Sequence, residues 1–132
     1  GGDISKEGET AIDIVAYAAH IAALIGAHII KVKPPTKHIE LSEAKKVYTS
    51  ENIPIETLTD RIRHIKQSCF QGKRIVVFSG GAAKDKNGLI NEIKELYKGG
   101  ANGSIIGRNS FQRPLNEAMD LLNEVTDIYK GR

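Results

Sequence analysis

The sequence predicts an α/β fold in which short parallel strands alternate with helices. Three short apolar segments, residues 28–32, 74–79 and 103–106, are each followed by a run with helical spacing. These segments are almost continuously apolar, which is typical of strands covered on both faces in a parallel sheet. The 132 residues, 40% hydrophobic and 27% charged, suit one globular domain. We therefore treat residues 1–132 as a single segment.

The chain is expected to open with a helix that ends at Gly26. Thr10 is placed to cap this helix, with Asp13 three residues later. Apolar residues then recur at helical spacing: Ile14, Val15, Ala18, Ile21, Ala22 and Ile25. The β-branched run 28–32 follows and predicts a buried strand, which must end before Pro34 and Pro35 because proline cannot continue a ladder.

A long polar connection is expected after the first strand. Residues 33–54 carry many charges and no clear period, and so long a connection is usually functional or mobile. It is either a solvated connector or a cover over the strand ends that contains Lys45, Lys46 and Tyr48. A second helix is predicted over residues 55–69.

Two further units repeat the order of strand and helix. The first combines strand 74–79 with helix 89–98, and the second combines strand 103–106 with a helix from Pro114 to residue 128. Three consecutive strand–helix units specify a parallel sheet with right-handed crossovers. Two architectures fit this order, a small open doubly wound sheet or a segment of a (β/α)8 barrel.

Composition excludes several classes of partner. Acidic residues are interspersed among the basic ones despite a formal charge of +3, and only 5% of residues are aromatic, which argues against nucleic-acid binding. The longest apolar run, residues 21–30, is too short to span a bilayer. The single cysteine, Cys69, favours a reducing cytoplasm. The four histidines lack metal-ligand spacing, so we expect no metal.

Two glycine turns are candidates for binding a phosphate. Ligands of parallel α/β folds bind at the carboxyl ends of the strands, and these turns follow two neighbouring strands. Either turn alone is more simply a tight connection, but two together with a guanidinium favour an anion site. The candidate residues are Ser79, Gly80, Gly81, Gly107 and Arg108. A short extra helix is expected at residues 109–112.

Lys31 is the candidate nucleophile. Strand alternation places it opposite Ile30 and Val32, so that it points away from the helices if those two residues pack beneath them. Partial desolvation and the neighbouring charges of Lys33 and Arg108 favour the neutral amine, which attacks carbonyl groups. Alternatively, Lys31 ends its strand in solvent or is only a counter-charge for phosphate. The residues alone leave these alternatives open.

Four stretches together resemble the carboxyl-terminal half of the archaeal and bacterial type of class I fructose-bisphosphate aldolases. They cover nearly the whole chain in the right order: residues 14–19, 26–33, 78–81 and 103–109. Residues 48–52 are similar to the bacterial branch of that group. The resemblance implies that the chain supplies strands six to eight of a (β/α)8 TIM barrel.

The resemblance also implies a chemistry. Lys31 would form the Schiff base, Lys33 would be auxiliary, and the two glycine turns would bind the substrate phosphate. The reaction would be the reversible cleavage of fructose 1,6-bisphosphate in glycolysis and gluconeogenesis, without a metal or cofactor because the iminium accepts the electrons. The alternatives are an aldolase or thiolase of the same superfamily acting on another phosphorylated ketose, a non-catalytic phosphate-binding half-barrel, and a flavodoxin-like domain.

Departures from the family pattern set further expectations. Deoxyribose-phosphate aldolases place a second lysine two residues before the serine of the seventh strand, where this chain has Val77. The earlier strands and the proton-transfer residues of the family are not among these 132 residues. We expect three partners, a phosphorylated sugar, the amino-terminal half of the barrel and further copies of the protein in a homo-oligomer. The isolated segment should show little activity.

Overall fold

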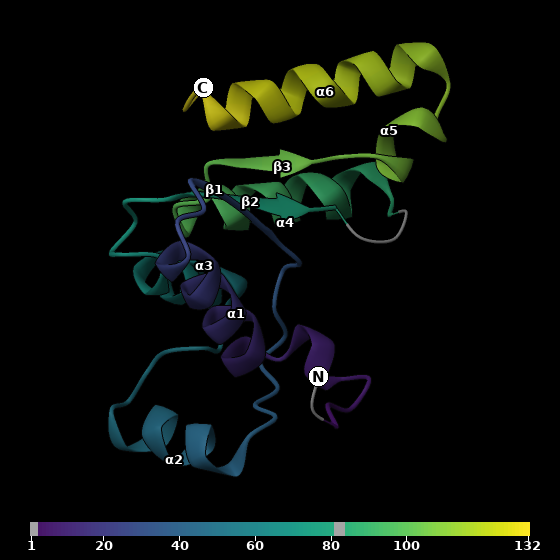
Figure 1. Cartoon of the computed structure of the whole chain (residues 1–132). Coiled ribbons are helices and arrows are strands. Elements are labelled where there is room, and N and C mark those ends of the chain that lie inside the picture. Colours follow the sequence, from purple (N-terminus) through teal and green to yellow (C-terminus); the bar gives the residue numbers. More distant parts are fainter. Residues whose placement is uncertain (1–2, 81–83) are drawn as a thin grey trace.

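A computed structural model of the chain, which describes residues 3–80 and 84–132, confirms a helix followed by three β/α units (Figure 1). The three strands form one parallel sheet in the order β1-β2-β3: β1 (Ile29–Val32), β2 (Ile75–Ser79) and β3 (Gly103–Ile105). The long helices are α1 (Ile12–Leu24), α3 (Leu58–Ser68), α4 (Lys86–Lys98) and α6 (Leu115–Tyr129). The shorter elements are η1 (Gly8–Thr10), α2 (Ser42–Ser50) and α5 (Arg108–Phe111).

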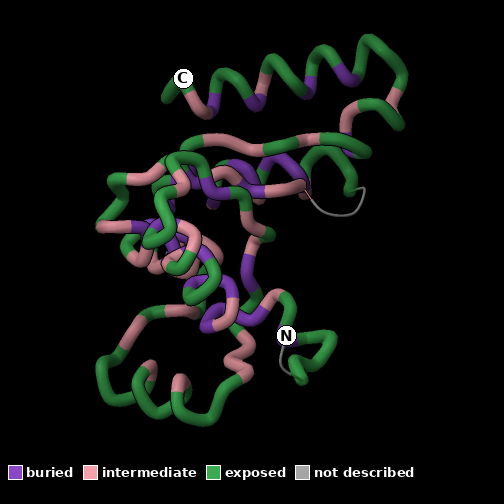
Figure 2. Tube along the Cα trace, viewed as in Figure 1, coloured by how far each residue is buried: buried purple, intermediate pink, exposed green. Residues whose placement is uncertain are grey.

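The hydrophobic core lies between one face of the sheet and the four long helices. Ile30, Val76 and Phe78 point into this core and are at most 4% exposed. Neighbouring helices pack in chain order, α1 on α3, α3 on α4 and α4 on α6. Buried residues therefore follow the inner sides of these helices, while their outer sides are exposed (Figure 2).

None of the elements in the described part of the chain covers the opposite face of the sheet. Ile29, Ile75 and Ile105 lie on it and are 64%, 46% and 49% exposed. Parallel sheets are normally covered on both faces. The sheet thus has the one-sided cover expected of a barrel segment, in which this second face would line the interior.

The helix ends follow local sequence signals in most places. Gly26 and Gly100 have φ values of 98° and 94°, a left-handed conformation that glycine adopts at no steric cost. Thr57 and Asp60 form a reciprocal capping box at the start of α3. The two glycines explain why α1 and α4 end where the sequence predicts.

The predicted cap of the first helix is wrong. Ala11 occupies the N-cap position without a side-chain hydrogen bond, and Thr10 belongs to η1. The carbonyl of Thr10 instead accepts a 2.8 Å hydrogen bond from the backbone N–H of Thr36. The carboxylate of Asp13 accepts from the N–H groups of Glu40 and Leu41 at 3.0 and 2.9 Å. Contacts with the segment after β1 have replaced the local cap.

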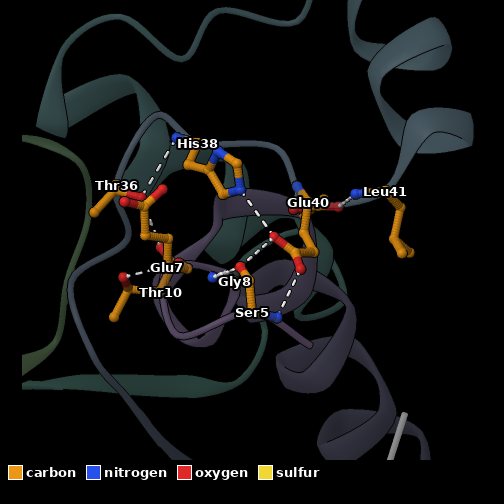
Figure 3. A network of polar contacts seen from close by, with 9 residues as sticks. Ser5, Glu7, Gly8, Thr10, Thr36, His38, Glu40 and Leu41 are labelled. Atoms are coloured by element: carbon orange, nitrogen blue, oxygen red, sulfur yellow. Dashed lines mark hydrogen bonds and ion pairs between the residues drawn. The ribbon is translucent and has the colours of Figure 1, made fainter. Parts of the chain in front are cut away.

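A polar network joins the amino-terminal segment to the chain after β1 (Figure 3). The carboxylate of Glu40 accepts 2.8 Å hydrogen bonds from the N–H and the hydroxyl of Ser5 and lies 2.8 Å from Nε2 of His38. The Ser5 N–H first, and then His38 and the Ser5 hydroxyl, lower the pKa of Glu40 below its ordinary value. The network fastens both segments beside the carboxyl end of β1.

The polar connection after β1 contains a helix that the sequence does not predict. Helix α2 spans Ser42–Ser50 and buries none of its residues. In Figure 1 its ribbon stands apart from the sheet, and its contact with α3 is made by the half-buried side chain of Tyr48. Apolar periodicity indicates a helix when one side of it is buried, and no residue of α2 is fully buried.

The amino ends of β2 and β3 are joined by a separate set of hydrogen bonds. Nζ of Lys66 donates to the Arg74 carbonyl at 2.8 Å and to Oδ1 of Asn102 at 2.5 Å. Oδ1 of Asn102 also accepts from the N–H of Val76 at 2.9 Å. This edge of the sheet is therefore tied together by a buried lysine and one side-chain amide.

None of the helices in residues 3–80 and 84–132 is long and apolar enough to cross a bilayer.

Candidate functional site

An open cavity of about 550 Å³ lies where the carboxyl ends of the three strands meet. Six of the residues that the sequence predicts for the site line it: Lys31, Lys33, Ser79, Gly80, Gly107 and Arg108. The seventh, Gly81, lies outside the described residues. The fold thus brings together side chains from β1 and from the segments after β1, β2 and β3.

Lys31 lies on the uncovered face of the sheet. Its neighbour Ile30 is 4% exposed in the core, and Val32 packs against that core, whereas Lys31 is exposed and lines the cavity. This confirms the direction that strand alternation predicts for Lys31. In the sheet register Lys31 pairs with Val77, so an aliphatic side chain occupies the adjacent position on β2.

The Gly80 N–H is already used by the sheet. It donates a 3.0 Å hydrogen bond to the carbonyl of Ile105 on β3. Gly80 therefore extends the pairing of β2 with β3 and cannot direct that N–H at a ligand without losing the bond. Ser79, which pairs with Ile105 in register, lines the cavity from the end of β2.

The cavity is strongly basic. Lys31, Lys33, Lys84 and Arg108 line it together with one carboxylate, that of Glu92. Lys84 forms an ion pair with Glu92, and Nζ of Lys33 lies 3.5 Å from an exposed carboxylate oxygen of Glu9. Exposed pairs of the second kind contribute little stability. The excess of positive charge favours an anionic ligand.

Sequence reasoning does not identify the hydrogen-bond role of Asn109, which lies on α5 immediately after Gly107 and Arg108. Asn109 is 2% exposed and contacts both ends of the segment that follows β2. Its Nδ2 donates to the Gly80 carbonyl at 3.3 Å, and its Oδ1 accepts from the Lys84 N–H at 2.7 Å. The predicted short helix at residues 109–112 is confirmed as α5, one residue earlier.

Tyr48 does not lie over the strand ends. It faces a second cavity of about 730 Å³ between α1, α2 and α3, where its hydroxyl lies 2.8 Å from Nε2 of His64. Burial, followed by the charge of Asp13, raises the pKa of Tyr48 to about 12. Burial also lowers the pKa of His64 below its ordinary value. The interpretation of Tyr48 as part of a cover over the active end is therefore wrong.

No group of three or more His, Cys, Asp or Glu side chains within residues 3–80 and 84–132 is close enough to hold a metal ion. The residues that line the cavity supply amines, a guanidinium, hydroxyl groups, one carboxylate and backbone groups.

Comparison with known proteins gives a consistent result. The model of the DeoC/LacD family aldolases matches residues 3–113. A protein named "Fructose-bisphosphate aldolase class 1" from Thermoproteus tenax is 32% identical over 132 residues, which cover 99% of this chain and 40% of that protein. A protein named "Probable fructose-bisphosphate aldolase class 1" from Chlamydia muridarum is 35% identical over 131 residues, covering 91% of this chain and 36% of its own length.

A solved structure described as an archaeal fructose 1,6-bisphosphate aldolase superposes on the whole chain. The TM-score is 0.73 at 25% identity, and the match covers 42% of that structure. A fructose-bisphosphate aldolase from Slackia heliotrinireducens has the same fold, with a TM-score of 0.65 and 40% of its chain covered. The chain thus spans about two fifths of the length of these proteins.

Proposed function

The chain belongs to the DeoC/LacD aldolase family, and from that premise we propose that the complete protein is a class I aldolase that cleaves fructose 1,6-bisphosphate reversibly. The products are dihydroxyacetone phosphate and glyceraldehyde 3-phosphate. One observation carries the proposal: the exposed amine of Lys31 shares a basic cavity with the ends of β2 and β3.

Lys31 provides the nucleophile. Its neutral amine adds to the C2 ketone, and the loss of water from this adduct leaves an iminium. As the C3–C4 bond breaks, its electron pair moves to the iminium nitrogen and forms an enamine, while the C4 hydroxyl gives up its proton and becomes the aldehyde of the released product. Protonation of the enamine at C3 and hydrolysis then return dihydroxyacetone phosphate and the free amine. The groups that move these protons belong to the remainder of the barrel.

The C1 phosphate binds between the ends of β2 and β3. The Ser79 hydroxyl and the Arg108 guanidinium, with the backbone of Gly107 and of Gly81, hold its oxygens, while the Gly80 N–H keeps its hydrogen bond to the Ile105 carbonyl. A guanidinium binds phosphate through two parallel hydrogen bonds, which fixes the orientation of the anion as well as its position. Binding energy from this distant phosphate aligns the ketone with Lys31.

Val77 favours this reaction over that of the deoxyribose-phosphate relatives. It is the register partner of Lys31. A second amine at that position would help to hold the first one neutral by charge repulsion, but a valine cannot. In this protein the other cations that line the cavity are Lys33, Lys84 and Arg108, none of which lies on β2.

The remaining β/α units of the barrel are proposed to cover the open face of the sheet. This segment spans about two fifths of its relatives, and Ile29, Ile75 and Ile105 are exposed apolar side chains on the open face. Burying such side chains stabilises a fold by about 25 cal/mol per Å² removed from water. The same closure would enclose the cavity that Lys31 lines.

The test is to trap the Schiff base by borohydride reduction in the full-length protein with dihydroxyacetone phosphate. We expect a mass increase on the peptide that contains Lys31, and its loss in Lys31→Arg, which keeps the charge but removes the nucleophile. Lys33→Ala is the matched control, because it removes a neighbouring cation from the same cavity and should retain the adduct. An adduct that persists in Lys31→Arg would reassign the nucleophile, and a wild-type protein without any adduct would indicate a phosphate-binding module.

A further inference from the structure

Asn109 is a buried polar side chain between the two glycine turns. It is 2% exposed and is the second residue of α5, one position after Arg108 in the proposed phosphate site. Buried amides are almost always hydrogen-bonded, because an unpaired polar group inside a protein is costly. The hydrogen-bond partners of Asn109 therefore indicate the structural role of its side chain.

The side chain of Asn109 forms hydrogen bonds with Gly80 and Lys84, which follow β2. The Gly80 carbonyl can only accept a hydrogen bond and the Lys84 N–H can only donate one. A side-chain amide matches this pair in one orientation only, with Nδ2 toward Gly80 and Oδ1 toward Lys84. A carboxylate or an aliphatic side chain of similar size cannot satisfy both.

Arg113, which follows α5, contacts both Asn109 and Lys84. Its Nε donates to the Asn109 carbonyl at 2.7 Å, and its Nη2 donates to the Lys84 carbonyl at 2.6 Å. Lys84 is therefore held by its N–H through Asn109 and by its carbonyl through Arg113. Hydrogen bonds from a charged guanidinium are stronger than those between neutral groups.

We propose that Asn109 is a positioning residue that fastens Gly80 and Lys84, on the β2 side of the cavity, to the turn after β3, so that Ser79, Lys84 and Arg108 face one phosphate. This inference rests on the proposed function, since it assigns a role within that phosphate site. Ser79 and Lys84 belong to one of these segments and Arg108 to the other. Holding them in place before the ligand arrives removes an ordering cost from binding.

The role predicts an effect that depends on the phosphate of the ligand. In the full-length protein, Asn109→Ala should raise the dissociation constant for inorganic phosphate about tenfold, as measured by titration calorimetry, because two hydrogen bonds that order the site are lost. The rate of borohydride trapping should fall by a similar factor with subsaturating dihydroxyacetone phosphate. With unphosphorylated dihydroxyacetone the trapping rate should stay within about twofold, since Lys31 on β1 is unaffected.

Asn102→Ala is the matched control. Asn102 also links two elements through its side chain, but at the amino ends of the strands, where its Oδ1 accepts from Lys66 and Val76. This variant should lower the unfolding temperature while leaving phosphate affinity and both trapping rates unchanged. Equal phosphate affinities for Asn109→Ala and Asn102→Ala would overturn the proposal, as would equal slowing of trapping with both ketones.

A second variant keeps the test decisive if Asn109→Ala does not fold. Arg113→Lys retains the charge but not the forked pair of bonds, and it should weaken phosphate binding about threefold; an unchanged affinity would count against the proposal. A wild-type protein that binds phosphate but traps no ketone would refute the aldolase proposal and leave Asn109 to be judged by calorimetry. A wild-type protein without phosphate affinity would refute both.

Discussion

His64 is the residue whose protonation should be visible in the stability of the fold. Burial holds its pKa below the ordinary value of 6.5, so the unfolded chain takes up a proton at a higher pH than the native protein does. Stability is then complete above about pH 7 and decreases as the pH falls through 6.5 toward the lower native pKa. We expect urea unfolding midpoints to decrease between about pH 8 and about pH 5.5.

The non-titrating variant His64→Gln isolates this effect. It places an amide near the Tyr48 hydroxyl and should flatten the pH dependence in that interval. The carboxyl groups with lowered pKa values, Glu40, Glu43 and Asp60, take up protons below their ordinary values of 4.5, 4.5 and 3.8 and therefore act outside the interval. An equally steep loss of stability in the variant would show that His64 is not the responsible group.

The sequence supports a prediction for Lys31 but not for Asn109, and the reason is the range of their contacts. The direction of Lys31 follows from alternation with its immediate neighbours Ile30 and Val32. The side-chain partners of Asn109 lie 25 and 29 residues away. A single asparagine after a Gly-Arg pair carries no signal of such distant partners.

At the scale of elements, helices α3 and α4 approach closely at Gly99. A Cβ atom at this position would lie 2.5 Å from Cβ of Ile62 and 2.8 Å from the Thr59 carbonyl. The clash involves backbone and a core side chain, neither of which can move far. Gly99→Ala should therefore lower the free energy of unfolding by about 1–3 kcal/mol, the usual cost of overpacking, measured by chemical denaturation.

Gly103→Ala is the corresponding control on β3. Its nearest contact would be Cγ1 of Val77 at 3.7 Å, which is ordinary packing distance. If both glycine variants had the same stability, close packing of α3 on α4 would not be the reason for glycine at position 99.

The elements that were predicted and those that were missed differ in what stabilises them. Strands β1 and β2 and the four long helices bury apolar residues at a regular period, so the sequence indicates them directly. Helix α2 has no fully buried residue, and its residues leave no such pattern. The start of α1 depends on Thr36, Glu40 and Leu41, which are distant in sequence, and the local capping rule fails there.

At the scale of the whole molecule, three apolar surfaces are exposed. One is the open face of the sheet, the second follows one side of α1, and the third runs from α5 onto α6. The residues are, in that order, Ile29, Ile75 and Ile105; Tyr17, Ile21, Leu24 and Ile25; Phe111, Leu115, Met119 and Leu122. Exposed apolar side chains promote association, as do the outer edges of β1 and β3, which pair with no other strand that the structure describes.

Residues 1–132 produced alone should therefore self-associate. Sedimentation velocity should give species heavier than the 14.4 kDa monomer, and a dye that binds apolar surface should fluoresce with the segment. The double variant Leu24→Glu, Leu115→Glu should shift the distribution toward monomer. A monomeric wild-type segment that does not bind the dye would contradict the proposal that further β/α units cover these surfaces.

The two rims of the sheet are held by unrelated sets of contacts, and this separation has a practical consequence. Lys66 and Asn102 join the strands at one rim, whereas the cavity of Lys31 and Arg108 occupies the other. Substitutions that strengthen the first rim are therefore expected to raise heat tolerance without displacing the side chains that line the cavity. A thermostability screen confined to the connections that precede β2 and β3 would test this separation.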